Sequence, residues 1–243
     1  MEAATPPPVP APAPRSGTSQ PIQVGRVISD AFAIYSSNLG ALLLTGLGIA
    51  VVFGIVVGIL NDSDSFILQV IGSILQLVGA AIYTGFVVKL VQDVRDGKRD
   101  QSVGELISAA MPALGALIVY SVLSSIAITI GFFLLIIPGL ILMTIWSVGA
   151  PAVVAEGRGP IEAFGRSYEL VRGQTWTVFG VLVVVFLILL AAFIVVGIIG
   201  AAIGGIVGAA IVSVLVMLLY MPVVALVSST LFFDLGGGAN STL

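Results

Sequence analysis

The sequence contains four long stretches without a single Asp, Glu, Lys or Arg. They cover residues 31–61, 65–88, 106–155 and 173–233, and they are 31, 24, 50 and 61 residues long. A helix needs about 20 apolar residues to cross the hydrocarbon core of a bilayer. The four stretches therefore hold one, one, two and two helices. The sequence predicts an all-α polytopic integral membrane protein with six transmembrane helices.

The division of the two longest stretches follows from proline and glycine. Pro138 and Gly139 divide the third stretch, because proline removes an amide donor and glycine frees the backbone, so we expect a hairpin turn there. The fourth stretch has no such pair, and we expect its division within the glycine-rich run 197–205, at a position that the sequence leaves open. The six expected spans lie at about 40–60, 66–90, 112–136, 139–156, 176–198 and 207–231.

The composition agrees with a lipid environment and limits the chemistry. Hydrophobic residues make up 58% of the chain and charged residues 9%, against roughly 45–50% and about 25% in soluble proteins. The chain has no His and no Cys, so it offers no imidazole base, no thiolate nucleophile and no typical zinc site. A net charge of −3 gives no basic surface for nucleic acid. We expect no catalytic residues, no metal and no cofactor.

The positive charges predict the orientation. All nine Lys and Arg residues lie in the regions 15–26, 89–99 and 158–172, which share one side of the membrane if there are six spans. The loop 61–65 and the two other turns, on the opposite side, carry none. Lys and Arg concentrate on the cytoplasmic side of membrane proteins. Both termini are therefore expected in the cytoplasm, with the protein in the cell membrane.

The chain ends are expected to lie outside the membrane domain. Residues 1–23 hold seven of the twelve prolines, which is typical of a disordered segment that cannot form a packed core. We expect a Pro-rich cytoplasmic tail over 1–23, a six-helix membrane domain over 24–236 and a short cytoplasmic tail over 237–243.

Three amphipathic segments precede the three pairs of spans. Residues 24–31 and 103–110 are identical at five of eight positions, and 161–171 shows the same helical spacing of apolar residues. The chain thus reads as three copies of one unit, an interfacial helix followed by a hairpin. We expect the apolar faces of these leader helices to point toward the acyl chains. They either only connect the hairpins or also sense lipid or dock a partner. Three aromatic residues are placed for the interfacial belt: Tyr35, Tyr168 and Trp176.

Glycines at a spacing of four predict close helix packing in lipid. They pack either within the chain or between two copies, and part of the second set can belong to the turn between the last two spans. The set comprises Gly54 and Gly58 in the first span and Gly200, Gly204 and Gly208 near the last turn.

The region 134–180 resembles a known membrane domain. It contains Pro-Gly at 138–139, Glu-Gly at 156–157, Arg-Ser at 166–167 and Arg-Gly at 172–173. This pattern resembles the multi-span membrane domain ahead of the catalytic domain in some bacterial glycerophosphodiester phosphodiesterases, and its free-standing relatives of unknown function. Their catalytic domain requires histidine, which this chain lacks, so the hydrolase activity is not carried over. The resemblance implies a lipid-embedded accessory or scaffold module.

The sequence therefore favours a non-catalytic membrane protein that acts as a lipid-contacting scaffold or accessory module. It can also bind a membrane or cytoplasmic protein, or a second copy of itself. We expect no binding of nucleic acid. A passive carrier or oligomeric channel is one alternative. A lipid-modifying enzyme is another, and it requires Asp93, Asp96 and Glu156 to converge around a metal. The candidate partner- or lipid-facing residues are Glu156, Arg166, Ser167, Glu169 and Arg172.

Overall fold

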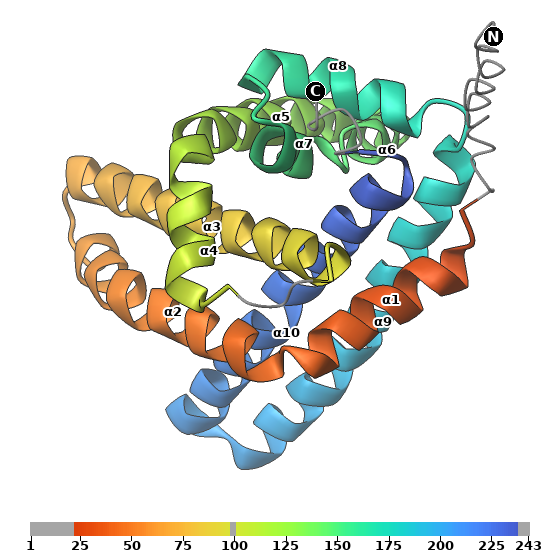
Figure 1. The fold of residues 1–243 in the computed structure, drawn as a ribbon. Coiled ribbons are helices and arrows are strands. Elements are labelled where there is room, and N and C mark those ends of the chain that lie inside the picture. Colours follow the sequence, from red (N-terminus) through yellow and green to blue (C-terminus); the bar gives the residue numbers. More distant parts are fainter. Residues whose placement is uncertain (1–21, 98–100, 238–243) are drawn as a thin grey trace, which may run out of the picture.

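The computed structural model describes residues 22–97 and 101–237, and all regular structure in these residues is helical. This confirms the all-α fold class. The helices are α1 (Val24–Ser37), α2 (Leu39–Asn61), α3 (Phe66–Arg95), α4 (Val103–Ala110), the 3₁₀ turn η1 (Met111–Ala113), α5 (Leu114–Leu134), α6 (Ile136–Ile145), α7 (Gly149–Glu156), α8 (Pro160–Val171), α9 (Thr175–Ile203) and α10 (Gly205–Asp234) (Figure 1).

Six helical stretches in the described part of the chain are long and apolar enough to cross a bilayer, as the sequence predicted. The chain is a multi-pass membrane protein. The stretches are Leu39–Leu60, Phe66–Arg95, Val103–Leu134, Ile136–Glu156, Thr175–Ile203 and Val214–Asp234.

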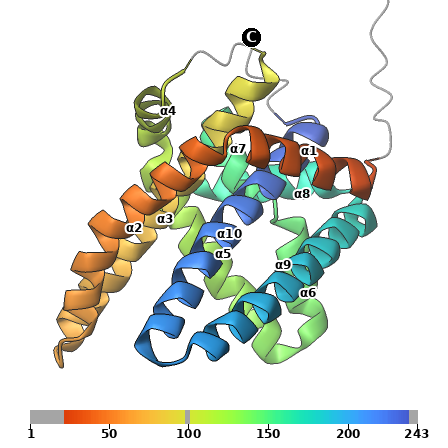
Figure 2. The same cartoon turned by 90° about the horizontal axis from the view of Figure 1, so that it is seen from below.

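Consecutive spans lie next to each other: α2 packs along α3, α5 along α6, and α9 along α10. The connections within these pairs point to one end of the molecule, whereas α1, α4 and α8 lie at the other end (Figure 2). We call the latter the leader-helix end. The α2–α3 pair extends away from the remaining helices, and it contacts α10 mainly through α3.

The leader helices form where the sequence predicted them, but their apolar faces do not all point toward lipid. Val27, Ala31 and Ile34 of α1 are buried in the core, because α1 packs on α9 and α10. Ala163 and Val171 of α8 are buried in the same way. Small and β-branched side chains at this spacing fit between neighbouring helices, so burial against protein replaces the expected burial in acyl chains. The lipid-facing prediction was wrong for these residues.

The chain reverses at Leu135 rather than at Pro138 and Gly139. Leu135 has an extended backbone, and α6 begins at the next residue. Pro138 is the third residue of α6, where the missing N–H has no intrahelical partner to lose. A Cβ on Gly139 would overlap the ring of Phe132. The pair therefore stands just after the turn, and its glycine allows α6 to approach α5.

The last two spans divide at Gly204 and Gly205, within the predicted run. Both residues have positive φ, +72° and +60°, a conformation that glycine adopts without steric cost. Next to this turn, a Cβ on Gly208 would overlap the carbonyl oxygen of Gly200, so α9 and α10 approach closely there. Packing within the chain accounts for this pair.

The first-span glycines behave differently. A Cβ on Gly54 or on Gly58 would meet no atom within 4 Å. Both residues are exposed. In the described part of the chain, no other helix therefore packs closely against Gly54 or Gly58.

The expected tails lie almost entirely outside the described residues. Ile22, which the sequence assigned to the first tail, is buried in the core, and its backbone N–H donates to the Gln174 side chain at 2.9 Å. Ile22 thus packs with the membrane domain, and the predicted boundaries of the two tails otherwise stay predictions.

Candidate functional site

A break divides the fourth span into α6 and α7, which the sequence did not predict as separate helices. Residues 146–148 interrupt the helix. The interruption lies about 12 Å from Glu156, measured along the axis of α7. Pro151 explains the position, because it has no N–H to donate to the carbonyl of Ser147 four residues earlier. The break therefore exposes backbone carbonyls inside a membrane-spanning segment.

Hydroxyl groups from three other helices satisfy these carbonyls. Ser228 of α10 donates to the Ser147 carbonyl at 2.6 Å, and Tyr120 of α5 donates to the Trp146 carbonyl at 2.7 Å. Ser167 of α8 donates to the Ile145 carbonyl at 2.8 Å and accepts from the Val148 N–H at 3.3 Å. Broken helices are tolerated at membrane depth only where protein or water satisfies the backbone. The break is thus a structural joint held by α5, α8 and α10.

Aromatic packing fixes α8 against this joint. The ring of Phe164 lies 4.6 Å from the Tyr120 ring and 4.8 Å from the Trp146 ring, measured between centroids. Aromatic pairs at such distances contribute about 0.5–1.5 kcal/mol beyond their buried area. Phe164 therefore links α8 both to α5 and to the interrupted segment.

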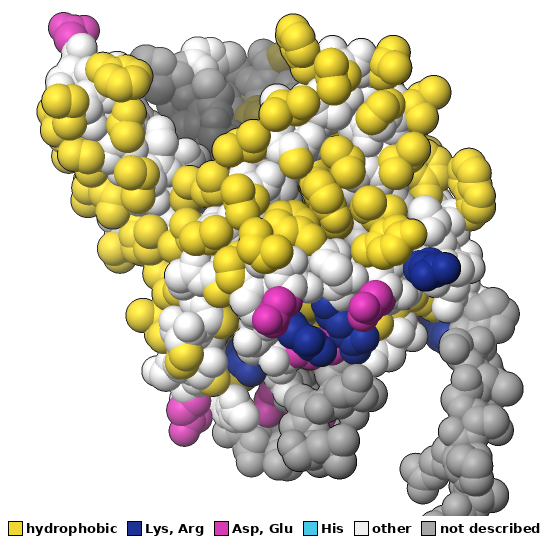
Figure 3. Space-filling model, turned by 90° about the horizontal axis from the view of Figure 1, so that it is seen from above, with side chains coloured by type: hydrophobic (Ala, Val, Ile, Leu, Met, Phe, Trp, Pro, Cys, Tyr) yellow, Lys and Arg dark blue, Asp and Glu magenta, His cyan; other side chains and the backbone are white. Residues whose placement is uncertain are grey.

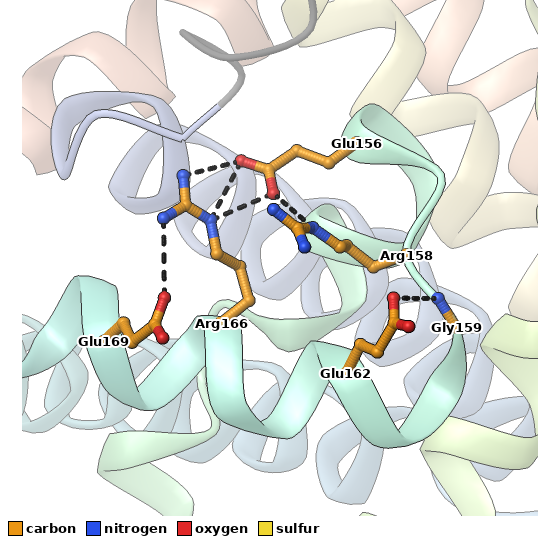
Figure 4. A network of polar contacts seen from close by, with 6 residues as sticks. All are labelled: Glu156, Arg158, Gly159, Glu162, Arg166 and Glu169. Atoms are coloured by element: carbon orange, nitrogen blue, oxygen red, sulfur yellow. Dashed lines mark hydrogen bonds and ion pairs between the residues drawn. The ribbon is translucent and has the colours of Figure 1, made fainter.

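An ion-pair cluster joins the end of α7 to α8 (Figure 4). Glu156 accepts hydrogen bonds from Nε of Arg166 at 2.9 and 3.1 Å, from Nη2 of Arg166 at 2.9 Å and from Nε of Arg158 at 3.1 Å. The side chains of Glu156 and Arg166 are only 4% and 14% exposed. Bidentate pairs of this kind are stronger and more specific in geometry than single contacts. The hydrogen bonds to Glu156 raise the pKa of the Arg166 guanidinium.

Three of the five predicted site residues meet in this cluster. Glu169 completes it, 3.8 Å from Nη1 of Arg166. Ser167, by contrast, is fully buried at the α6–α7 joint. Arg172 follows α8 and is exposed, and it forms no ion pair with any described residue. The five residues therefore do not form one site: Glu156, Arg166 and Ser167 hold α8 in place, whereas Glu169 contacts Arg166 within α8 and Arg172 stays at the surface.

The sequence did not predict a second ion pair, between Arg95 and Asp234. Nη2 of Arg95 lies 2.7 Å from Oδ1 of Asp234, and its guanidinium carbon lies 5.5 Å from the Phe233 ring centroid. This pair joins the ends of α3 and α10 at the leader-helix end. The signal in the sequence was Asp234 itself, the first charge after the fourth uncharged stretch.

The carboxylates that a lipid-modifying enzyme would need do not converge. Asp93 is buried in α3, Asp96 is exposed at the end of that helix, and Glu156 is held by two arginines. Among residues 22–97 and 101–237, no three His, Cys, Asp or Glu side chains gather where they could hold a metal ion. Asp93, Asp96 and Glu156 therefore do not form a metal site in the described part of the chain.

Charged side chains gather along one border of the surface seen in Figure 3, and a broad hydrophobic area covers most of the remaining surface. The described basic residues of α8 and of its two flanking segments are Arg158, Arg166 and Arg172. Such segregation is typical of a protein whose apolar surface faces acyl chains and whose charged border faces headgroups and water.

The comparisons with known proteins agree with a membrane protein. A UPF0259 membrane protein of Pectobacterium carotovorum is 35% identical over 103 residues, which is 42% of this chain and 41% of the relative. The match thus covers less than half of the relative's length, and the name of the relative states no activity. No protein-family profile matches the chain. No solved structure matches it either.

Proposed function

We propose that the chain is a non-catalytic, lipid-contacting scaffold or accessory module of the cell membrane, with both termini in the cytoplasm. The observation that carries this proposal is the surface of α8. Its exposed side chains divide into an acidic face, with Glu162 and Glu169, and a second stripe, with Ile161 and Tyr168. The resemblance of residues 134–180 to the membrane domain of the phosphodiesterases supports an accessory role.

The exposed stripe of α8 has the chemistry of a headgroup contact. Ile161, Tyr168 and Arg172 recur at i, i+7 and i+11 and so share one helical face, and all three are exposed. Trp176, in the first turn of α9, is 85% exposed. Tyr and Trp favour the headgroup level of a bilayer, and a nearby Arg attracts anionic lipids. Arg172 forms no ion pair with a described residue, so its guanidinium is available for a lipid phosphate.

The proposed orientation is supported by the distribution of the basic residues and is consistent with the ion pair of Arg95 with Asp234. The pair brings the ends of α3 and α10 together, as two ends on one side of a membrane require. Arg95, Arg158 and Arg166 all belong to the leader-helix end. The positive-inside rule favours placing this end in the cytoplasm.

Cysteine labelling tests the orientation. The natural chain has no cysteine, so Asp64→Cys and Glu169→Cys each give a single thiol at an exposed position. With a membrane-impermeant maleimide on intact spheroplasts, we expect Asp64→Cys to react and Glu169→Cys to react only after permeabilisation. Equal labelling of both variants before permeabilisation would refute the six-span orientation.

Lipid analysis tests the headgroup contact. We expect the full chain, extracted with its surrounding lipid in polymer nanodiscs, to be enriched in anionic lipids relative to the bulk membrane. The double variant Arg172→Gln, Trp176→Ala should lose about half or more of this enrichment, since a basic residue near the surface contributes about 1 kcal/mol to binding of anionic lipid. Mass spectrometry of the extracted lipids measures the ratio. An unchanged ratio in the variant contradicts the proposal, and Glu162→Gln, on the acidic face, is the matched control.

A further inference from the structure

The packing of α4 on α3 repeats the packing of α8 on α7. Gly85 of α3 faces Ala110 of α4, because a Cβ on Gly85 would lie 2.9 Å from the Cβ of Ala110. Val148, directly before α7, donates its N–H to the hydroxyl group of Ser167 in α8 at 3.3 Å. Ala110 and Ser167 are each the eighth residue of their helix. The two leader helices therefore contact the preceding span in the same register.

The sequence places an acidic residue at the same point of both arrangements. Asp93 follows Gly85 by eight residues, as Glu156 follows Val148, and an arginine comes two residues after each acid. Both leader helices also have a glutamate at the third position, and its carboxylate accepts a hydrogen bond from the backbone N–H just before the helix. Asp93 is thus the counterpart of Glu156.

The two acids differ in their cationic partners. Glu156 accepts hydrogen bonds from Arg158 and from Arg166, the seventh residue of α8 (Figure 4). The seventh residue of α4 is Ala109, which carries no charge and is exposed. The helix α4 therefore lacks the guanidinium that α8 supplies, and the surface at the corresponding position is open.

Asp93 is buried without a counter-charge among the described residues. It is 7% exposed, and its Oδ1 has no hydrogen-bond partner. Arg95 lies two positions further along the helix, a spacing at which side chains do not face each other, and it pairs with Asp234. Lys89, one turn earlier, donates to Gln92 at 3.3 Å and forms no ion pair with Asp93. A buried carboxylate without donors is costly.

We propose that Asp93 binds an external organic cation, a primary ammonium or guanidinium group, which enters beside Ala109 and takes the place that Arg166 has next to Glu156. Such groups donate charge-assisted hydrogen bonds to a carboxylate. Within residues 22–97 and 101–237, no three His, Cys, Asp or Glu side chains gather. A divalent metal ion would therefore lack the ligands that it requires at Asp93.

The position of Asp93 indicates two sources of this cation. Asp93 lies two residues before the end of the span Phe66–Arg95, at the leader-helix end, where headgroups meet water. Phosphatidylethanolamine carries a primary ammonium in its headgroup, and soluble amines carry the same group. The inference goes beyond the proposed contact of Arg172 with anionic lipid, because it concerns the opposite charge at a different place in the fold.

Lipid retention tests the headgroup source. The full chain is reconstituted into vesicles with equal amounts of phosphatidylethanolamine and phosphatidylcholine of the same acyl chains, and native mass spectrometry in mild detergent measures the lipid that stays bound. The trimethylammonium group of phosphatidylcholine donates no hydrogen bond, so we expect phosphatidylethanolamine to be retained about tenfold more. Asp93→Asn and Ala109→Arg should both abolish this preference. The first removes the charge, and the second supplies the guanidinium that α4 lacks.

Asp96→Asn and Ser108→Arg are the matched controls. Asp96 is exposed at the end of α3, and Ser108 is exposed on α4 directly before Ala109. These variants make the same charge changes at neighbouring positions, and both should keep the preference of the wild type. Ala109→Arg leaves Asp93 unchanged, so it carries the test even if Asp93→Asn does not fold.

Thermal unfolding tests the soluble source. If a free amine binds, the wild type in detergent without phosphatidylethanolamine should unfold at a higher temperature in ethylammonium chloride than in tetramethylammonium chloride of equal concentration, because a ligand of the folded state stabilises it. Asp93→Asn should show no such difference, whereas Asp96→Asn should behave as the wild type does.

Three results would overturn the proposal. One is a wild type that shows neither the lipid preference nor the amine effect. Another is a response that persists in Asp93→Asn or Ala109→Arg, since the cation then binds elsewhere. The third is a response that appears only in Lys89→Gln or in Lys98→Gln, Arg99→Gln, since a cation of the chain itself then neutralises Asp93. The contact of Arg172 with anionic lipid fails separately, through an unchanged lipid ratio in its own variant.

Discussion

Replacing Glu156 with glutamine is expected to lower the free energy of unfolding by about 3 kcal/mol. The substitution keeps the shape of the side chain and removes its charge. Arg166, whose side chain is 14% exposed, would then lose the carboxylate that accepts the hydrogen bonds of its Nε and Nη2. Breaking a buried pair by removing one partner is costly because the remaining charge stays poorly solvated. Reversible denaturation in mixed micelles, followed by circular dichroism, measures the loss.

Two further variants decide whether the buried pair causes this loss. Glu169 is 70% exposed and lies 3.8 Å from Arg166, so Glu169→Gln should cost no more than about 0.5 kcal/mol. Combining Glu156→Gln with Arg166→Gln should restore part of the stability, because no unpaired guanidinium remains at that position. If Glu156→Gln and Glu169→Gln destabilise the protein equally, the cluster does not hold α8 to α7.

The sequence predicted the membrane fold because charge is excluded from the hydrocarbon core. The gaps between charged residues give six spans, and residues 22–97 and 101–237 contain six helical stretches that are long and apolar enough to span a bilayer. The same reasoning could not locate the joint in the fourth span, since no charged residue lies at the joint or between it and Glu156. Pro151 was the available signal. Proline alone does not distinguish a kink from a break, because the outcome depends on donors such as Ser228 that are far away in sequence.

The candidate site was predicted only in part, for a related reason. Residues three apart on a helix are neighbours, and Arg166 and Glu169 of α8 lie 3.8 Å apart accordingly. The main partner of Arg166 is instead Glu156, which precedes α8 and faces it only because Gly157 ends α7 in a left-handed conformation. Helical periodicity describes contacts within one helix, so it gives no information on contacts between two helices.

The α6–α7 joint also explains why the leader helix α8 lies where it does. Ser167 and Phe164, on one face of α8, contact the interrupted segment, and Arg166 contacts the carboxylate at the end of α7. The orientation of α8 is thus fixed by two sets of contacts, one with the interrupted segment and one with the end of α7. Its remaining exposed stripe, with Tyr168, is consequently held in a fixed direction at the leader-helix end.

Substitution of Gly149 by alanine should therefore disturb the joint strongly, with an expected cost of about 3 kcal/mol from overpacking and a lost hydrogen bond. A Cβ on Gly149 would overlap the hydroxyl group of Tyr120. To relieve the overlap, the Tyr120 ring must move, and its hydrogen bond to the Trp146 carbonyl is then lost. The carbonyl would keep only the longer hydrogen bond of 3.3 Å from the Gly149 N–H, and a hydrogen bond lost inside a span is not replaced by water.

The second substitution Tyr120→Phe distinguishes this cause from a general intolerance of alanine. It removes the hydroxyl group whose hydrogen bond Gly149→Ala would break, whereas the ring carbons Cζ and Cε2 would still overlap the new Cβ. Gly149→Ala should therefore cost less in the Tyr120→Phe background than in the wild type, by the part of the cost that comes from the lost hydrogen bond. Gly165 of α8 provides the control, because a Cβ there would meet no atom within 4 Å. Gly165→Ala should be neutral or stabilise the protein by up to about 1 kcal/mol, since alanine favours a helix. If the two alanine substitutions have equal effects, or if the costs of Gly149→Ala and Tyr120→Phe simply add, contact with the Tyr120 hydroxyl does not determine the geometry of the joint.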